Sequence, residues 1–213
     1  MTKVFLDDAP LDVAAPGLQP ALEAASAAAA HQGRIVVEAT ADGSPLPNDL
    51  LAEPTTDPLA AAELRFTTAE PKSMVRTVVL DVAEAIPHLR ATQAAAAEQV
   101  QAGRMDHART HLGEAMEIWS AAQRAVADGS ALLELDLNTI VFDSGPVTES
   151  TTQSTAESAI ESLRTDLAEL QRALASDDPS ALGDVLAYDL DQRAEQWQSL
   201  MHRMAEVIDA ARD

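Results

Sequence analysis

Residues 71–102 read PKSMVRTVVLDVAEAIPHLRATQAAAAEQVQA, and this stretch decides most of the fold. Its branched apolar residues recur at spacings of three and four, as they do on one face of an α-helix. They are Val75, Val78, Val79, Val82 and Ile86. We therefore expect a helix from Pro71 to the residue before Gly103. Pro87 lies inside it, and because proline removes one backbone hydrogen bond we expect a kink near 81–85 or a break into two helices.

The apolar pattern stays helical beyond Gly103. Asp106 is a good N-cap for a second helix that reaches at least Ala127. The segment 144–155 is polar, rich in Ser and Thr and without an apolar period, so we expect a loop there. The apolar segment 131–142 is expected to pack internally rather than to bind a partner.

Two further helix starts follow the loop. Ser154 and Glu157 have the spacing of a capping box, which predicts the start of a third helix. Asp178 followed by Pro179 predicts the start of the last helix, with Asp as the cap and Pro in the first turn. Four long helices in this order predict an antiparallel bundle of about four helices over residues 71–213.

The first 70 residues have the mixed pattern of a small α/β domain. Strands are expected at 4–6, 11–13, 34–40 and 64–68, an Ala-rich helix at 18–32 and a short helical turn within 46–51. This order of elements resembles the β-grasp (ubiquitin-like) topology, and a generic α/β layer that caps the helices is the alternative. The sequence thus predicts an α+β protein with domains at 1–70 and 71–213.

Charge excludes some partners and favours others. The 213 residues include 35 acidic and 14 basic ones, for a formal charge of −21. Such a surface repels nucleic acid and anionic lipid and attracts basic proteins. Adaptation to salt is the alternative origin of this charge. There is no cysteine, which excludes disulfides and thiolate metal sites.

Neither a signal peptide nor an apolar stretch long enough to span a membrane is visible. We therefore expect a cytoplasmic protein that does not bind membranes. The excess of Arg over Lys and the abundant Ala are typical of a GC-rich bacterial genome.

The sequence lacks the common signatures of nucleotide sites and of serine hydrolases. We therefore predict no catalytic residues, no cofactor and no enzymatic activity. One weak pattern for a metal site is present, because His107, His111 and Glu114 lie at helical spacing. A solvated helix face is the alternative interpretation, and it is favoured. The acidic residues Asp184, Asp189 and Asp191, with Tyr188, are likewise better explained as a solvated face than as a cation site.

Four large apolar residues are candidates for binding a partner. They are Trp119, Trp197, Leu137 and Phe142. Packing in the core is the favoured interpretation of the two tryptophans. An exposed indole would instead be a candidate anchor for a partner.

Three stretches are similar to the flagellin export chaperones, which are small helical bundles that hold an aggregation-prone filament protein. They read SMVRTVVLD (73–81), EQVQAGRMDHAR (98–109) and ASDDPSALGDVL (175–186), within about residues 72–205. The resemblance implies a cytoplasmic bundle that binds a flagellar or other export substrate.

Three functional hypotheses remain open at this point. The leading one is a non-enzymatic scaffold, adaptor or chaperone, in which a partner helix docks in an apolar groove between the helices. The second is a metal-binding or metal-dependent bundle that uses His107, His111 and Glu114. The third is a structural homo-oligomer.

Overall fold

The computed structural model describes residues 2–56, 60–143 and 153–211. The chain divides into two compact units, Met1–Met74 and Val75–Asp213. The first contains a mixed sheet and the second is helical, so the predicted α+β class is confirmed. Within the described ranges, none of the helices combines the length and the apolar character needed to cross a lipid bilayer.

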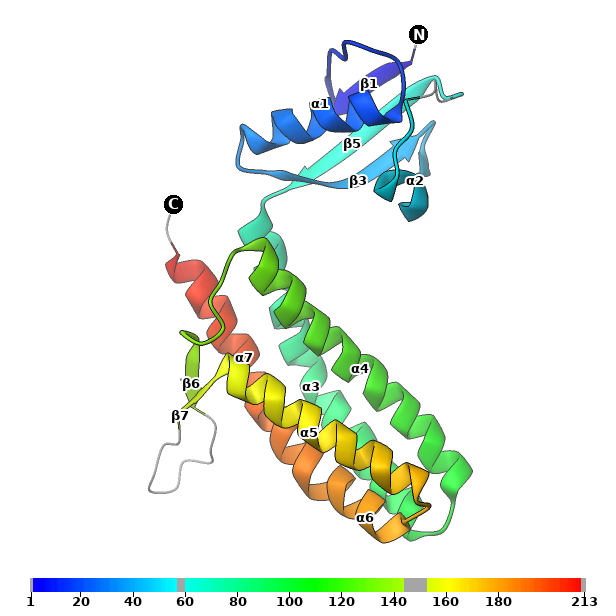
Figure 1. Ribbon diagram of the computed structural model, residues 1–213, viewed down its shortest axis with the longest axis vertical. Coiled ribbons are helices and arrows are strands. Elements are labelled where there is room, and N and C mark those ends of the chain that lie inside the picture. Colours follow the sequence, from blue (N-terminus) through cyan, green and yellow to red (C-terminus); the bar gives the residue numbers. More distant parts are fainter. Residues whose placement is uncertain (1, 57–59, 144–152, 212–213) are drawn as a thin grey trace. The chain divides into compact units, whose positions relative to one another are not determined.

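The N-terminal unit is a five-stranded sheet with one long helix against it (Figure 1). Its elements are β1 (Lys3–Leu6), β2 (Ala9–Pro10), α1 (Leu18–Ala30), β3 (Ile35–Ala41), β4 (Ser44–Pro45), α2 (Asn48–Ala52) and β5 (Glu63–Ala69). The strand order is β2-β1-β5-β3-β4. The central pair, β1 and β5, is parallel, and the other pairs are antiparallel.

One face of this sheet packs on α1. The helix buries alanines at positions 21, 25 and 29 in addition to Leu18, because small side chains at a spacing of four let it lie close to the sheet. The sheet contributes Leu6, Ala39, Leu64 and Phe66 to the same core. These residues come from alternate positions of their strands, as expected for a sheet with one buried face.

Both edges of the sheet are short hairpin strands that contain proline. The predicted return strand at 11–13 is wrong, because β2 pairs earlier, with Leu6 opposite Ala9 and Phe5 opposite Pro10. The turn between them is Asp7-Asp8, and both residues have positive φ angles, 45° and 67°. Two left-handed turn residues close a hairpin in the smallest loop, which places β2 at once after β1.

The second unit contains four long helices, one helical turn of different geometry and a two-stranded ribbon (Figure 1). Its elements are α3 (Pro71–Gln101, which begins in the first unit), α4 (Met105–Leu132), β6 (Val141–Asp143), β7 (Gln153–Thr155), α5 (Ala156–Ala175), α6 (Pro179–Asp184), the π-helical turn Val185–Asp189 and α7 (Leu190–Ala210). All of these helices contribute to one apolar core.

Helix α3 is unbroken through Pro87, so the predicted division into two helices is wrong. Proline at this position leaves the carbonyl oxygen of Ala83, four residues earlier, without its usual helical donor. The side-chain amide of Gln198 on α7 donates to that oxygen at 3.2 Å. A neighbouring helix thus supplies the hydrogen bond that proline removes.

Helix α4 reaches beyond Ala127, through Asp128-Gly129-Ser130 to Leu132. Gly129 is needed there for a packing reason. A Cβ atom at this position would lie 2.7 Å from Cγ1 of Val75 on α3, closer than two carbons can approach. The absence of a side chain at Gly129 lets α3 and α4 pack closely at this level.

The helix caps follow the sequence in one case and differ in two. Asp106, predicted as the N-cap of the second helix, lies instead in the first turn of α4, and Arg104 is the N-cap. Asp178 caps α6, accepting from the amides of Ser180 and Ala181, with Pro179 at the first position as predicted. The predicted pair Ser154 and Glu157 is wrong by one residue. The capping box of α5 is formed by Thr155 and Ser158, whose side chains each bond the other's backbone. Most of the predicted loop, residues 144–152, lies outside the described residues.

Candidate functional site

A large cavity that the described residues line lies in the N-terminal unit, beside β1. Its volume is about 1,370 Å³. Its walls come from the start of β1, the segment 10–17, the first turn of α1 and the segment 60–64, and they are apolar apart from Thr2, Lys3 and Asp12. Ligand pockets are commonly apolar with a small number of polar groups, so this cavity is a candidate binding site.

The cavity exists because the β1–β2 hairpin opens after a few residues. The last bond between its two arms is donated by the amide of Leu11 to the carbonyl oxygen of Val4, at 2.9 Å. Beyond it, no backbone hydrogen bond among the described residues involves the segment 12–15. Val4 and Leu11 pack against the apolar core of the unit, so the cavity opens directly over that core.

The far end of the segment 10–17 is fixed at Gly17. This residue has a φ angle of +121°, which favours glycine. A Cβ atom here would lie 2.7 Å from the carbonyl oxygen of Thr56. The amide of Gln19 donates to Thr55 at 3.1 Å, so the chain is held on both sides of this contact.

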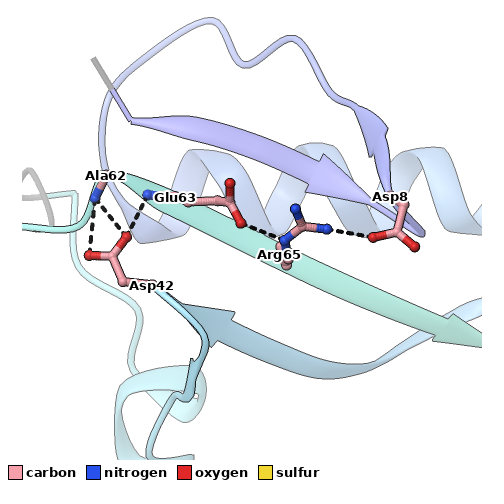
Figure 2. A network of polar contacts seen from close by, with 5 residues as sticks. All are labelled: Asp8, Asp42, Ala62, Glu63 and Arg65. Carbon is pink, nitrogen blue, oxygen red and sulfur yellow. Dashed lines mark hydrogen bonds and ion pairs between the residues drawn. The ribbon is translucent and has the colours of Figure 1, made fainter.

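The opposite wall, residues 60–62, is held by hydrogen bonds to β1 and to a hairpin turn. Lys3 donates its amide to Ala62, and Thr2 donates its hydroxyl to Ala61, both at 2.9 Å. The carboxylate of Asp42 accepts from the amides of Ala62 and Glu63, as Figure 2 shows. These bonds fix the wall at 60–62, in addition to the end of the other wall at Gly17.

Arg65 joins β5 to the first hairpin on the open face of the sheet. Its guanidinium pairs with Glu63 on the same strand and with Asp8 in the turn (Figure 2). It also lies over the ring of Phe5, 4.7 Å from the centroid, in a cation–π contact. These contacts raise the pKa of Arg65, and the hydrogen bond to Glu63 is the main cause.

The other turn residue, Asp7, holds the end of β5. Its carboxylate accepts from the amide of Thr68 at 2.8 Å and from the Thr68 hydroxyl. These two hydrogen bonds hold the pKa of Asp7 below its usual value, and the charge of Arg34 acts in the same direction. Each end of β5 is therefore held by a carboxylate from a left-handed turn residue, Asp42 at the start and Asp7 at the end.

The predicted metal ligands do not come together. His107 is exposed, His111 is half-buried, and Glu114 is exposed on the same helix. Glu114 instead lies 2.8 Å from Nε2 of His88 on α3, a residue that the sequence analysis did not single out. In the part of the chain that the structure describes, no three His, Asp or Glu side chains form an arrangement that could hold a metal ion.

The predicted partner-binding residues lie in or against the core of the helical unit. Trp119 and Trp197 are 1% and 0% exposed, and their rings meet edge to face with centroids 5.7 Å apart. Phe142 is buried as well, and Leu137 is half-buried against the core. The condition for an anchoring role, an exposed indole, is therefore not met by either tryptophan.

The acidic residues between α6 and the start of α7 are divided between solvent and ion pairs. Asp184 and Tyr188 are exposed, and Asp191 forms an ion pair with Arg90 on α3 at 2.7 Å. Burial raises the pKa of Asp189, and the charges of Asp166 and Glu169 raise it further. Arg193 opposes this effect, and it also pairs with the buried carboxylate of Asp166.

Two smaller clefts lie in the helical unit. One smaller cleft, of about 470 Å³, lies between the β6–β7 ribbon and α7. Another, of about 390 Å³, lies on one face of α4 between Gly113 and Arg124. The cavity beside β1 is much larger than either.

Comparisons with protein families, with curated proteins and with solved structures found no match for this chain.

The cavity was missed by the sequence analysis because it depends on where a strand ends. The weak signal for it is the pair of prolines at positions 10 and 16, which bracket a segment too irregular to continue β2.

Proposed function

We propose that this chain is a non-enzymatic protein-interaction module, in which a β-grasp (ubiquitin-like) unit binds the partner and an antiparallel four-helix bundle serves as scaffold. The observation that carries the proposal is the apolar cavity beside β1. Its volume and its few polar side chains suit the binding of an apolar surface.

The β-grasp assignment is supported by the sheet of the N-terminal unit. A hairpin is followed by a helix, and the last strand, β5, lies parallel to β1 in the middle of the order β2-β1-β5-β3-β4. A crossover of this kind places the helix on one face and leaves the other face open. The hydrogen bonds of Asp7 and Asp42 stabilise the arrangement at both ends of β5.

The four-helix assignment is supported by contacts between α3, α5 and α7. Arg76 pairs with Asp209, and Arg90 pairs with Asp191, so residue numbers rise along α3 as they fall along α7. The pair Arg193–Asp166 joins α7 to α5 as well. Antiparallel neighbours joined by short corners are the usual arrangement of such bundles.

The test is comparative affinity purification from the native host at low and high salt, followed by mass spectrometry. Wild type is compared with Ala61→Trp, which fills the cavity, and with Ala27→Trp at an exposed position of α1. We expect one stoichiometric partner with wild type and with Ala27→Trp, and loss of that partner with Ala61→Trp. The same set of proteins in all three samples would contradict the proposal.

The other hypotheses predict different results in the same samples. A flagellar filament protein or another export substrate as the partner would support the chaperone interpretation. Stoichiometric metal in protein purified without added metal would favour the metal-binding bundle with His107, His111 and Glu114. A concentration-dependent dimer by light scattering, with no other protein bound, would favour the homo-oligomer.

A further inference from the structure

Both long walls of the cavity beside β1 carry main-chain groups that have no backbone hydrogen-bond partner among the described residues. One wall is the start of β1, where the amide and carbonyl of Thr2 have no backbone partner among the described residues. The other is the segment 12–15, which likewise makes no backbone hydrogen bond in the described chain. The two walls diverge from the last hairpin bond, between Leu11 and Val4, and the cavity lies between them.

Such a cavity suits an extended peptide better than a lipid chain. A peptide in strand conformation offers amides and carbonyls that can pair with Thr2, just before β1, and with the segment 12–15, as in other cases of strand addition. Its side chains alternate between two faces, so every second one would enter the apolar space over the core. A hydrocarbon chain would leave the main-chain groups of both walls unpaired.

The lining defines which side chains fit. It is built from small and aliphatic residues, including Ala21, Ala61, Val13 and Leu64. The aromatic ring at its rim, Phe5, already has Arg65 over one face. Aliphatic side chains of the size of Val, Ile or Leu suit these walls.

The charge of the N-terminal unit indicates which residues of a bound peptide would lie between its aliphatic ones. Residues 1–74 include eleven acidic and four basic residues. Asp12 is exposed on the lining, and Asp8 at the end of the same hairpin has an 89% exposed side chain. Lysine or arginine at the solvent-facing positions of a bound strand would be attracted by this surface.

We infer that an extended partner segment, with aliphatic residues at alternate positions and basic residues between them, binds inside this cavity and pairs with the main chain of Thr2 and of the segment 12–15. The inference rests on the proposed function, because it names the chemistry of the partner for the same site.

The first experiment selects peptides from a displayed random library on the immobilised full-length protein. One enriched peptide is then synthesised with a fluorescent label, and its Kd is measured by anisotropy. We expect enriched sequences to alternate aliphatic and basic residues. Ala61→Trp should weaken binding about tenfold or more, and Ala27→Trp should bind as wild type does. If Ala61→Trp does not unfold cooperatively, Ala14→Trp, at an exposed position of the lining, is used in its place.

The second experiment separates strand addition from simple apolar binding. Amide hydrogen exchange is followed by NMR with and without the peptide, and with sodium decanoate as a hydrocarbon probe. Strand addition predicts slower exchange for the amides of Thr2 and of the segment 12–15, and decanoate should slow none of them. The inference would be overturned if the library yields no peptide. It would also be overturned if Ala61→Trp, or Ala14→Trp in its place, leaves peptide binding unchanged, or if the peptide binds without protecting these amides.

Failure of the inference and failure of the proposed function give different results. If a native partner depends on the cavity but protects no amide of Thr2 or of the segment 12–15, the inference fails and the proposed function stands. If no native partner depends on the cavity, the proposed function itself fails. Decanoate bound in the cavity, with no peptide selected, would make the cavity a site for hydrocarbon chains.

Discussion

The side-chain amide of Gln198 donates a hydrogen bond of 3.2 Å to the carbonyl oxygen of Ala83, the oxygen that Pro87 leaves without a helical donor. The two residues are 115 positions apart in the chain, on α7 and α3. This bond explains why α3 stays continuous through proline, and it makes one side chain responsible for the stability of a neighbouring helix.

Replacing Gln198 should therefore destabilise the protein in a way that depends on Pro87. Gln198→Leu leaves the carbonyl of Ala83 without a donor, and we expect the free energy of unfolding to fall by about 1–3 kcal/mol. In a Pro87→Ala background the helix supplies its own donor, so the same replacement should have a smaller effect. Urea unfolding of the four proteins measures this coupling.

The control for that experiment is Gln192→Leu, at an exposed position on the same helix. It should leave the free energy of unfolding nearly unchanged. Effects of Gln198→Leu and Pro87→Ala that add to within about 0.5 kcal/mol would show that the two residues are not coupled.

Gly129→Ala should destabilise the helical unit through a clash with Val75. The new Cβ would lie 2.7 Å from Cγ1 of a branched side chain that cannot turn away, and about 1–3 kcal/mol of stability should be lost. Val75→Ala should restore part of it. Gly113→Ala, on the same helix with no atom within 4 Å of its Cβ position, is the matched control.

The control should change stability in the opposite direction. Alanine is the better helix former, so Gly113→Ala should stabilise the protein by about 0.5–1 kcal/mol. Thermal unfolding measured by circular dichroism is sufficient for this comparison. Equal effects of the two glycine replacements would refute the packing argument.

Asp189→Asn should raise the melting temperature at neutral pH. The pKa of Asp189 is raised by burial and by Asp166 and Glu169, so its charged form is disfavoured in the folded state. Its contribution to stability is complete below the unfolded pKa, near 3.8, and is lost as pH rises through the folded pKa. The gain from Asp189→Asn should therefore vanish at low pH.

A scan of melting temperature against pH tests this prediction. Asp128→Asn, at an exposed position of α4, serves as the control and should follow wild type. A gain from Asp189→Asn that persists at pH values well below 3.8 would point to a cause other than charge.

Asp7 should show the opposite dependence on pH. Hydrogen bonds from Thr68 lower its folded pKa, so its stabilising contribution is present above the unfolded pKa of about 3.8 and is lost as pH falls through the folded pKa. We expect the Thr68 amide resonance to titrate with a midpoint below 3.8. Asp7→Asn should abolish that titration, and Asp49→Asn on α2 should not. A midpoint at or above 3.8 would be the contrary result.

The parts of the fold that depend on neighbouring residues in the chain were predictable. The Asp178-Pro179 helix start and the helical spacing of α3 follow from local rules. The continuity of α3 was not predictable, because the donor at Gln198 comes from another helix. The return strand was predicted at 11–13 instead of 9–10, because a two-residue turn of aspartates is less usual than Asn-Gly and does not mark where the turn ends.

The candidate site was less predictable than the fold. Trp119 and Trp197 lie on apolar faces, as the pattern indicated, but only the packing shows that their rings contact each other in the core. The pairing of Glu114 with His88 depends on how α3 and α4 meet. The cavity depends on the absence of strand pairing at 12–15, and hydropathy does not report that property.

The position of β5 has a consequence for folding of the chain during its synthesis on the ribosome. β5 is the last strand of its unit to be synthesised, yet it pairs with the first strand and accounts for the contacts of Asp7 and Asp42. A nascent chain that has released only the two hairpins and α1 has β1 and β3 without the strand that joins them. The unit can therefore complete its folding only after β5 leaves the exit tunnel, when synthesis has already begun on the long helix that follows.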